Sequence, residues 1–266
     1  MTRPALLLKL GGAVCAQPGI AARLAQAYRG QDCLIVHGGG PQLDQALASL
    51  EGEPERIDGL RVTSPAAADV VRGSLDLVGA DLAARLRAHG VNAQHVGAGQ
   101  ELFAAQTKRR RGRDLGRVGT VTAVRTDALP DAPQKAPGAP EASPGRVLVV
   151  TPVGWDAQGP LNVNADEAAA QLAISLQAQR LCLVTDVDGV RRGGQVVPEL
   201  DPQDARRFMS DGVAQGGMLP KLENALEALL GGVAAVTIGD LEAAASRPGT
   251  RGTTLGPVLP LLEATA

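Results

Sequence analysis

The chain has 266 residues and a formal net charge of −2 at pH 7, from 26 Lys and Arg residues against 28 Asp and Glu residues. This near-neutral balance argues against a protein that works on nucleic acid or on an anionic membrane surface. Hydrophobic residues make up 44% of the chain, which excludes a disordered protein, and the length suits one large or two small domains. Aromatic residues, at 2%, leave little material for stacking nucleic-acid bases.

The three cysteines, Cys15, Cys33 and Cys182, are far apart and form no CxxC pair. An odd number at such spacing fits neither a disulfide framework nor a zinc site, and indicates a reducing compartment. The apolar run near the N-terminus is too short for a secretory signal, and no stretch approaches the ~18 apolar residues of a membrane span. We therefore expect a cytoplasmic protein without a membrane partner.

Short apolar strands, glycine turns and helical stretches alternate along the chain. The predicted elements are, in order, a strand at 6–10, a helix at 21–28, a strand at 33–36, helices at 42–50 and 66–89, a strand at 92–96, a hairpin from 102–108 and 118–124, a strand at 146–150, a helix at 165–176, a strand at 181–184, a helix at 217–230 and a strand at 233–238. Such alternation is typical of crossover connections in a parallel sheet. The sequence therefore predicts an α/β fold with a mostly parallel sheet.

Two segments interrupt this alternation. Residues 130–145 contain five prolines and four alanines in sixteen positions, which predicts a loop or a semi-rigid linker. Residues 108–113 hold five basic side chains in six positions. We interpret this basic run as a solvated hairpin tip rather than a nucleic-acid patch, because the whole chain carries a slight negative charge.

Several common catalytic arrangements are missing from the sequence. It contains no GxxxxGK[ST] phosphate loop, no complete GxGxxG fingerprint and no GxSxG elbow. The three histidines, His37, His89 and His95, do not have metal-ligand spacing. We therefore expect a chemistry that needs neither a nucleophilic side chain nor a histidine metal cluster.

Charge and glycine meet at the ends of the first two predicted strands. Lys9 interrupts an apolar strand, where a charge is costly unless it emerges at a functional edge, and Gly11 and Gly12 follow it. The glycines at 38–40 close the next strand and precede a helix, an arrangement that favours anions. Taken alone, Lys9 could be a lysine whose ammonium group reaches solvent at a strand end, and the glycines at 38–40 could form only a tight turn. Together, however, they would open on the same carboxyl edge of a parallel sheet, where ligands bind.

Four further polar positions could belong to a ligand site. Arg61 precedes the long helix at 66–89 and could pair with a carboxylate or phosphate. Asn162 precedes the helix predicted at 165–176, and Asp166 lies at the start of that helix, where it could also be only an N-cap. Lys221 lies in a first helical turn, the unfavourable end of the dipole for a cation, which makes sense if it serves an anion bound there. This inventory fits phosphoryl transfer, which depends on positioning and charge stabilisation.

Six short sequence motifs follow one another in a specific order and together span nearly the whole chain. They are KLGG (9–12), VHGGGPQLD (36–44), GLRVT (59–63), LNVNADEAA (161–169), TDVDGV (185–190) and GGMLPKLENAL (216–226). In this order the chain resembles the amino-acid kinase superfamily. GLRVT followed by NVNAD resembles the N-acetylglutamate kinases rather than the aspartokinases, glutamate 5-kinases or UMP kinases.

The resemblance implies a fold and a reaction. The implied fold is a three-layer sandwich around a central, mostly parallel sheet, with an N-terminal lobe at 1–176 for acetylglutamate binding and dimerisation and a C-terminal lobe at 177–266 for ATP. The implied reaction is direct in-line transfer of the ATP γ-phosphoryl group to the γ-carboxylate of N-acetyl-L-glutamate, the second step of arginine synthesis. The acceptor is already ionised at pH 7, so no general base is needed. Mg²⁺ would be carried mainly by the phosphates.

The resemblance also implies roles for individual residues. Lys9 and Lys221 would stabilise charge on the moving phosphoryl group, and Asp166 would hold both lysines. Gly11, Gly12 and Gly39 would offer N–H groups to the phosphates and the transition state. The residues implied for the acceptor are Gly39, Gly40, Arg61 and Asn162, with Arg61 on a carboxylate. The residues implied for ATP, besides Gly11 and Gly12, are Asp186, Val187, Asp188, Gly189, Val190, Arg191, Val213, Ala214 and Gln215.

Some features depart from the family pattern. The proline-rich segment stands where members usually carry a helix, and residues 96–99 lack a frequent GLSG string. Lys9 lies so near the start that no room remains for the extra N-terminal helix of arginine-inhibited hexamers, so we expect a homodimer without strong arginine inhibition. Two other readings stay open: a kinase for carrier-linked aminoadipate or glutamate in lysine synthesis, and a catalytically silent sensor of nucleotide or amino acid.

Overall fold

The computed structural model describes residues 6–52, 55–130 and 145–256. At its centre is an eight-stranded sheet. In spatial order the strands are β14 (Glu199–Leu200), β16 (Thr253–Leu255), β15 (Ala235–Gly239), β11 (Arg180–Val184), β1 (Leu6–Leu10), β2 (Cys33–His37), β8 (Arg146–Val150) and β5 (Asn92–Val96). All neighbours pair parallel except β15 and β16. The predicted mostly parallel sheet is confirmed.

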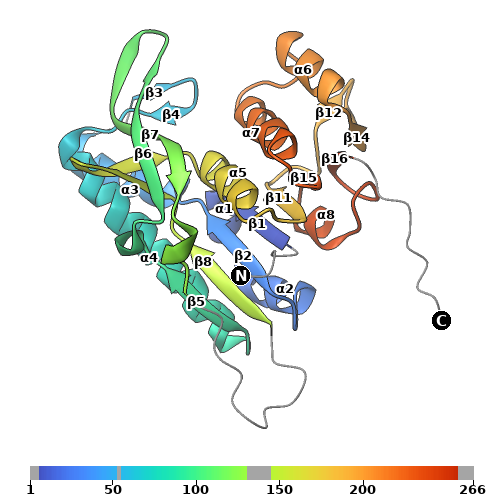
Figure 1. Cartoon of the computed structure of the whole chain (residues 1–266), viewed down its shortest axis with the longest axis horizontal. Helices are drawn as coiled ribbons and strands as arrows, with labels where there is room; N and C mark the ends of the chain where they lie inside the picture. The colour runs from blue at the N-terminus through green and yellow to red at the C-terminus, as the bar shows by residue number, and fades with distance from the viewer. Residues whose placement is uncertain (1–5, 53–54, 131–144, 257–266) are drawn as a thin grey trace.

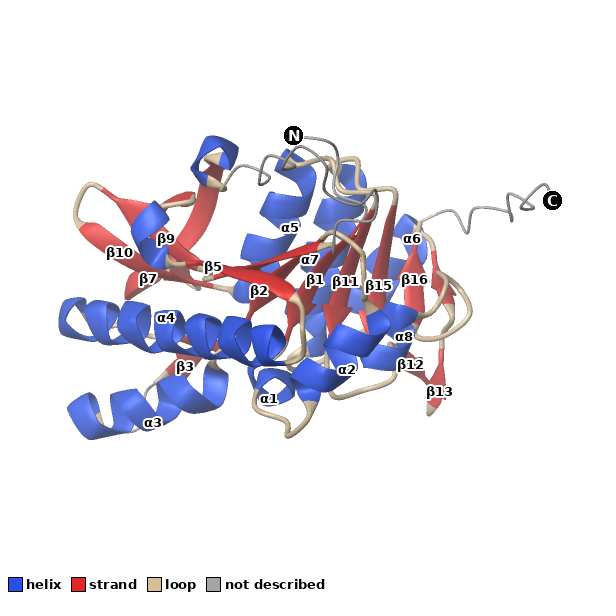
Figure 2. Ribbon diagram, turned by 90° about the horizontal axis from the view of Figure 1, so that it is seen from below, coloured by secondary structure: helices blue, strands red, loops and turns tan. Residues whose placement is uncertain are grey.

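Helices cover both faces of this sheet (Figure 2). One face carries α5 (Ala165–Ser175), α6 (Pro202–Ser210) and α7 (Met218–Leu230). The other carries α1 (Gly12–Cys15), α2 (Ile20–Ala27), α4 (Pro65–Ala88) and α8 (Leu241–Ala245), with α3 (Gly40–Glu51) packed on α4. The result is the three-layer α/β sandwich that the resemblance implied.

Local sequence explains where the longer helices begin. Ser64 caps α4 by accepting a hydrogen bond from the Ala67 N–H, and Pro65 occupies the first turn, where its missing N–H costs nothing. Arg85 and Arg87 lie in the last turn of α4, the favourable end of the dipole for cations. These signals account for the close match between the predicted helix at 66–89 and α4.

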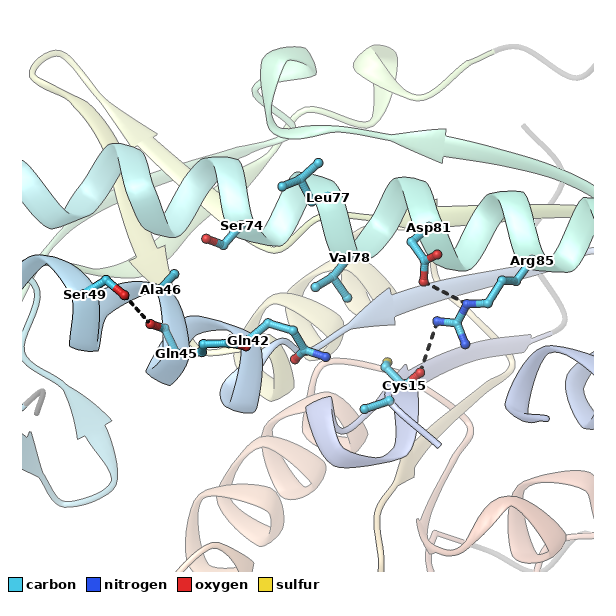
Figure 3. A pocket seen from close by; sticks show the side chains of 11 residues that line it. Cys15, Gln42, Gln45, Ala46, Ser49, Ser74, Leu77, Val78, Asp81 and Arg85 are labelled. Atoms are coloured by element: carbon cyan, nitrogen blue, oxygen red, sulfur yellow. Dashed lines mark hydrogen bonds and ion pairs between the residues drawn. The ribbon is translucent and has the colours of Figure 1, made fainter. Parts of the chain in front are cut away.

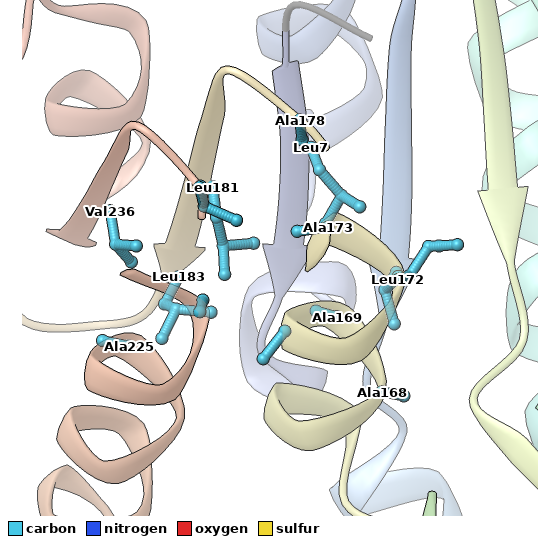
Figure 4. Packing of buried hydrophobic residues seen from close by; sticks show 14 of the residues in the cluster. Leu7, Ala168, Ala169, Leu172, Ala173, Ala178, Leu181, Leu183, Ala225 and Val236 are labelled. Carbon is cyan, nitrogen blue, oxygen red and sulfur yellow. The ribbon is translucent and has the colours of Figure 1, made fainter. Parts of the chain in front are cut away.

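The residues of β1 alternate between the two layers of the core. Leu7 packs in the cluster shared with α5 and α7, while Leu6, Leu8 and Leu10 pack in the cluster shared with α2 and α4. Alanines on α5 let that helix lie close against the sheet (Figure 4). By the same alternation Lys9 shares the face of Leu7, and its side chain therefore reaches towards α5 and α7 at the carboxyl edge.

A second group of strands stands beside the sandwich (Figure 1). Four strands form a closed barrel: β6 (Phe103–Arg110), β7 (Arg113–Val124), β9 (Val153–Asp156) and β10 (Gly159–Val163). β6 and β7 are the predicted antiparallel hairpin, with the basic run at its tip. A separate two-stranded hairpin, β3 (Arg56–Ile57) and β4 (Leu60–Arg61), lies next to it.

The remaining predictions have mixed outcomes. The predicted strands and helices all have counterparts in the structure. The elements that were not predicted are α1, α6, α8, β3, β4, β9, β10, β14, β16 and the two-residue strands β12 (Arg191–Arg192) and β13 (Gln195–Val196). Residues 131–144 lie outside the described residues, so the loop expected there stays a prediction. Within the described part of the chain, no helix combines the length and apolar content that a membrane span needs.

Candidate active site

Two lysines share one buried carboxylate at the carboxyl edge of the sheet. Lys9 Nζ lies 2.9 Å from Asp166 Oδ1, and Lys221 Nζ lies 2.9 Å from Asp166 Oδ2. The side chains of Lys9 and Asp166 are only 7% and 6% exposed. The three residues come from β1, from the first turn of α5 and from the first turn of α7. The structure thus brings together the three residues expected to be catalytic.

The electrostatics of this cluster favour an anion. Burial acts to raise the pKa of Asp166, but the nearby Lys9 and Lys221 ammonium groups outweigh it and hold that pKa below its usual range. The pKa of Lys221 is lowered, first by burial and then by repulsion from Lys9. With the carboxylate ionised and both lysines protonated, the cluster carries one excess positive charge in a largely buried position.

The two glycine turns pack against each other beside the lysines. A Cβ on Gly12 would lie 2.5 Å from the Gly40 backbone N, and a Cβ on Gly38 would lie 2.9 Å from the Gly12 backbone N. Such distances exclude larger residues, so glycine here serves close backbone approach rather than flexibility. Gly11 differs from its neighbours because its N–H already donates to Val184 O at 3.1 Å within the sheet.

A pocket of about 280 Å³ extends from Lys9 towards the barrel and the β3–β4 hairpin. Seven residues expected from the sequence line it: Lys9, Gly12, Gly39, Gly40, Arg61, Asn162 and Asp166. The pocket therefore joins the phosphoryl side of the predicted site to its acceptor side. A volume of this size suits a small amino-acid derivative.

Arg61 grips a carboxylate of the protein itself. Its Nη2 lies 2.5 Å from Asp44 Oδ1 and 3.3 Å from Gly40 O, and its Nε lies 3.1 Å from the same Asp44 oxygen. The Arg61 side chain is 7% exposed, whereas that of Asp44 is 44% exposed. Among the described residues, Nη1 of Arg61 has no hydrogen-bond partner. Asp44 thus holds the guanidinium in place and leaves one edge of it for a ligand.

Two asparagines on either side of Val163 also line the pocket. Asn162 Nδ2 donates to Thr63 Oγ1 at 3.0 Å, which ties the NVNAD string to the GLRVT string. Asn164, rather than Asp166, is the N-cap of α5 and accepts from the Asp166 N–H at 2.8 Å. The Asp166 side chain is thereby left for the lysines.

The residues expected around ATP lie in two loops on the C-terminal side. Asp186, Val187 and Gln215 are exposed, and Asp188 pairs with Arg191 at 2.9 Å. Val190 and Ala214 are 1% and 4% exposed and belong to the apolar core, so only their backbone can face a ligand. The other expected positions are Gly189, which is buried, and Val213, which is half-buried.

Some pocket residues were not expected from the sequence. Arg56, which pairs with Asp44 at 2.8 Å, and Gly59 and Leu60 of the β3–β4 hairpin all line the pocket. Asp44 lies in the VHGGGPQLD string, one helical turn after the glycines. That position was the only feature of the sequence that could have indicated a role for Asp44 near the pocket. The described residues contain no group of three or more His, Cys, Asp or Glu side chains that could hold a metal ion.

Comparison with known proteins places the chain in a family. The sequence profile described as the amino acid kinase family matches residues 4–240. The chain therefore belongs to the amino acid kinase family, and the resemblance drawn from its motifs is confirmed.

Individual relatives agree with this. An acetylglutamate kinase of Rubrobacter xylanophilus is 40% identical over 234 residues, covering 86% of this chain and 87% of the relative. An acetylglutamate kinase of Thermus thermophilus is 38% identical over 245 residues, covering 89% of this chain and 91% of the relative. Among solved structures, smu.665 of Streptococcus mutans has a TM-score of 0.74 at 27% identity, covering 94% of this chain and 98% of that one.

Proposed function

We propose that this protein transfers the γ-phosphoryl group of ATP to the γ-carboxylate of N-acetyl-L-glutamate, giving N-acetyl-L-glutamyl 5-phosphate and ADP. The observation that carries the proposal is the Lys9–Asp166–Lys221 cluster, which opens on a pocket lined by Arg61. Relatives of 40% and 38% identity named acetylglutamate kinase support the acceptor, and the reaction is the second step of arginine biosynthesis. They favour this acceptor over a carrier-linked one and over a silent sensor.

The chemistry follows from charge placement. The acceptor carboxylate attacks the γ-phosphorus in line, the bond between that phosphorus and the bridging oxygen of ADP breaks, and the leaving oxygen keeps the electron pair. Lys9 and Lys221 stabilise the negative charge that moves across the phosphoryl oxygens, and Asp166 keeps the two ammonium groups apart and aimed. Arg61 holds a carboxylate of the acceptor through the edge that Asp44 leaves open.

The glycine turns and the C-terminal loops complete this proposal. Gly12, Gly39 and Gly40 offer backbone N–H groups to phosphate oxygens and to the acceptor, whereas the N–H of Gly11 is already bonded in the sheet. The loops at 186–191 and 213–215 face the nucleotide. We assign acceptor binding to a lobe at 1–176 and nucleotide binding to a lobe at 177–266.

Mg²⁺ enters this scheme together with ATP. The one carboxylate at the centre, Asp166, is engaged by both lysines, and the described residues offer no dedicated metal cluster. Phosphate oxygens and water would then supply the Mg²⁺ ligands, which suits an ion that keeps much of its hydration. Bound there, Mg²⁺ would neutralise part of the phosphate charge.

A homodimer formed through α4 is part of the proposal. Leu77 projects from α4 with 74% of its surface exposed, beside a hollow of about 770 Å³ (Figure 3). Val78, Ala46 and Ser74 line the same hollow, and its two charged residues, Asp81 and Arg85, pair with each other, so the lining carries no net charge. The three free, buried cysteines suit a reducing compartment, and we place the protein in the cytoplasm.

The test is an acceptor panel. Purified protein is given ATP and Mg²⁺ with N-acetylglutamate, glutamate, aspartate or aminoadipate, and ADP release and hydroxamate formation are followed in parallel. We expect turnover on N-acetylglutamate alone. Turnover on another acceptor would overturn the substrate assignment, and folded protein without turnover on any of the four would overturn the proposed reaction.

A further inference from the structure

The basic tip of the β6–β7 hairpin contacts the tip of the β3–β4 hairpin (Figure 1). Arg110 Nε lies 3.0 Å from Asp58 Oδ2. Arg111 approaches the same carboxylate with two nitrogens, Nη2 at 2.6 Å from Oδ1 and Nε at 2.9 Å from Oδ2. The Asp58 side chain is only 22% exposed, and both arginines, Arg110 first, hold its pKa below the usual range. Two of the five basic side chains in the run, Arg110 and Arg111, therefore share an acidic partner about fifty residues away in the sequence.

Both hairpins turn through two residues with positive φ. In β3–β4 these are Asp58 at 49° and Gly59 at 80°, and in β6–β7 they are Arg111 at 49° and Gly112 at 75°. Such turns match the twist of the strands and favour Asn, Asp or Gly at the first position. Asp58 fits that preference, but Arg111 does not. An arginine in this left-handed conformation is strained, and its two-point contact with Asp58 offsets the strain.

The β3–β4 hairpin has little of its own to hold it. It pairs only Arg56 with Arg61 and Ile57 with Leu60, and it belongs to no larger sheet. At its base, Thr63 exchanges backbone hydrogen bonds with β7, accepting from Arg117 N and donating to Leu115 O. A two-stranded hairpin this short is not stable alone. Its position over the pocket therefore depends on contacts with its surroundings: Ile57, Leu60 and Val62 pack on β7 near the base of the hairpin, and Asp58 pairs with the two arginines at its tip.

The β6–β7 hairpin, in contrast, is fixed to the catalytic layer. Lys108 Nζ lies 2.9 Å from Glu167 Oε2, and Glu167, whose side chain is 9% exposed, also accepts from the Val121 N–H at 2.8 Å. Glu167 follows Asp166 directly on α5. A continuous chain of contacts thus runs from α5 through the β6–β7 hairpin to Asp58, and from there to Arg61 in β4.

We propose that Arg110 and Arg111 are positioning residues that hold the β3–β4 hairpin, and with it Arg61, in the geometry that receives a carboxylate acceptor. This inference rests on the proposed function. Loss of the contact loosens the acceptor side of the pocket but leaves the Lys9–Asp166–Lys221 cluster intact. The expected signature is weaker acceptor binding at nearly unchanged turnover, because the lost interaction acts equally in the ground and transition states.

Asp58→Asn and Arg111→Gly test this proposal from both sides of the contact. Asn keeps the turn preference while removing the charge, and Gly removes the guanidinium while relieving the strain at φ 49°. We expect each variant to raise the KM for N-acetylglutamate about three- to tenfold, with kcat and the KM for ATP within about twofold. Arg111→Gly should raise this KM without lowering the melting temperature of the protein. If Arg111 only stabilised the fold, its loss would lower the melting temperature.

Glu101→Gln is the matched control. Glu101 also has a positive φ, of 47°, and pairs with an arginine, Arg125, at 2.8 Å, but it lies outside the pocket. An acceptor KM in Asp58→Asn and Arg111→Gly no higher than in this control would overturn the proposal.

Hydrogen exchange gives a readout that needs no reaction. We expect the amides of residues 56–62 to exchange faster in Asp58→Asn than in the wild type, and no such change in Glu101→Gln. Equal exchange in the wild type and Asp58→Asn would overturn the proposal that Arg110 and Arg111 hold the β3–β4 hairpin, even if the kinase assay succeeds. Failure of the wild-type protein to phosphorylate N-acetylglutamate would instead overturn the proposed function, and the exchange data would still decide whether the arginines hold the hairpin.

Discussion

Three charged side chains meet where β1, α5 and α7 come together, with Lys9 and Asp166 buried and Lys221 14% exposed. Each would be costly alone: the Asp166 carboxylate stabilises both ammonium groups and screens Lys9 from Lys221, and the lysines keep Asp166 ionised. The sequence signalled both lysines because each sits where a cation is unfavourable, in an apolar strand or in a first helical turn. The position of Asp166 alone did not signal its use, since an aspartate at a helix start is usually a cap; only the resemblance to the amino-acid kinases implied that it holds both lysines.

At the same scale, a second buried group links stability to pH. His37 is fully buried behind the glycine turn, and burial lowers its pKa to about 4 from about 6.5 in the unfolded chain. Between these values only the unfolded chain takes up the proton. The contribution of His37 to the free energy of unfolding is therefore fully present above about pH 6.5. It is lost as the pH drops towards 4, by about 3 kcal/mol in all.

Urea unfolding at pH 7 and pH 5 measures this effect. We expect His37→Gln to lose much of the difference in unfolding free energy between the two pH values. His89, which is exposed at the end of α4, provides the control, and His89→Gln should keep the wild-type difference. A wild-type difference that persists in His37→Gln would show that another group is responsible.

At the scale of elements, the strands and helices with strong local signals were predictable. The strands β1, β2, β8, β11 and β15 are mostly apolar runs, and α3, α4, α5 and α7 have apolar residues at helical spacing. In contrast, β9 and β10 are short, contain Gly154, Gly159 and Pro160, and exist because they pair with each other and with the β6–β7 hairpin. Such long-range pairing leaves little trace in local sequence.

The helix α6 shows the opposite situation. Asp201 caps it by accepting from the N–H groups of Gln203 and Asp204, and Pro202 occupies its first turn. This start signal was present in the sequence, and Ala205, Phe208 and Met209 follow helical spacing, but the helix has only nine residues and most of them are polar. A start signal on so short and polar a segment was not enough to predict the helix.

Two glycines of α4 give a matched test of how this helix packs. A Cβ on Gly79 would lie 2.6 Å from His95 Nε2 and 2.7 Å from His37 Nε2, whereas a Cβ on Gly73 would meet nothing within 4 Å. Gly73→Ala should raise the unfolding free energy by about 0.5–1 kcal/mol through helix propensity. Gly79→Ala should lower it by about 1–3 kcal/mol through overpacking. Equal effects of the two substitutions in denaturant unfolding would contradict this packing.

At the scale of the whole molecule, the class, the sheet and most of the site followed from the order of motifs. The sequence could not predict which charged side chains from distant segments pair with one another. Arg61 was expected on a substrate carboxylate, but it also needs Asp44 to hold it. The basic run was expected to be a solvated hairpin tip, and it does lie at the tip with the Arg111 side chain 75% exposed; what was not expected is that Lys108, Arg110 and Arg111 each also have an acidic partner on another element.

The proposed dimer is also a property of the whole molecule. Two large apolar side chains on long helices stand out, Leu77 on α4 at 74% exposure and Leu230 at the end of α7 at 62%. We expect the wild type to sediment as a dimer, Leu77→Asp as a monomer and Leu230→Asp as a dimer, because burying a charge at the α4 face is costly. A dimeric Leu77→Asp protein, or a monomeric wild type, would contradict an α4 interface.

The central claim is that Lys9 and Lys221 stabilise the moving phosphoryl group. The most direct measurement is kcat at saturating ATP and N-acetylglutamate for Lys9→Ala and Lys221→Ala, with Arg206→Ala, on the exposed side of α6, as the control for loss of a positive charge. Circular dichroism melting establishes that each variant is folded. We predict that kcat falls by at least about 100-fold in both lysine variants and is unchanged in the control. Folded lysine variants that retain kcat within a few-fold of the wild type would contradict the account.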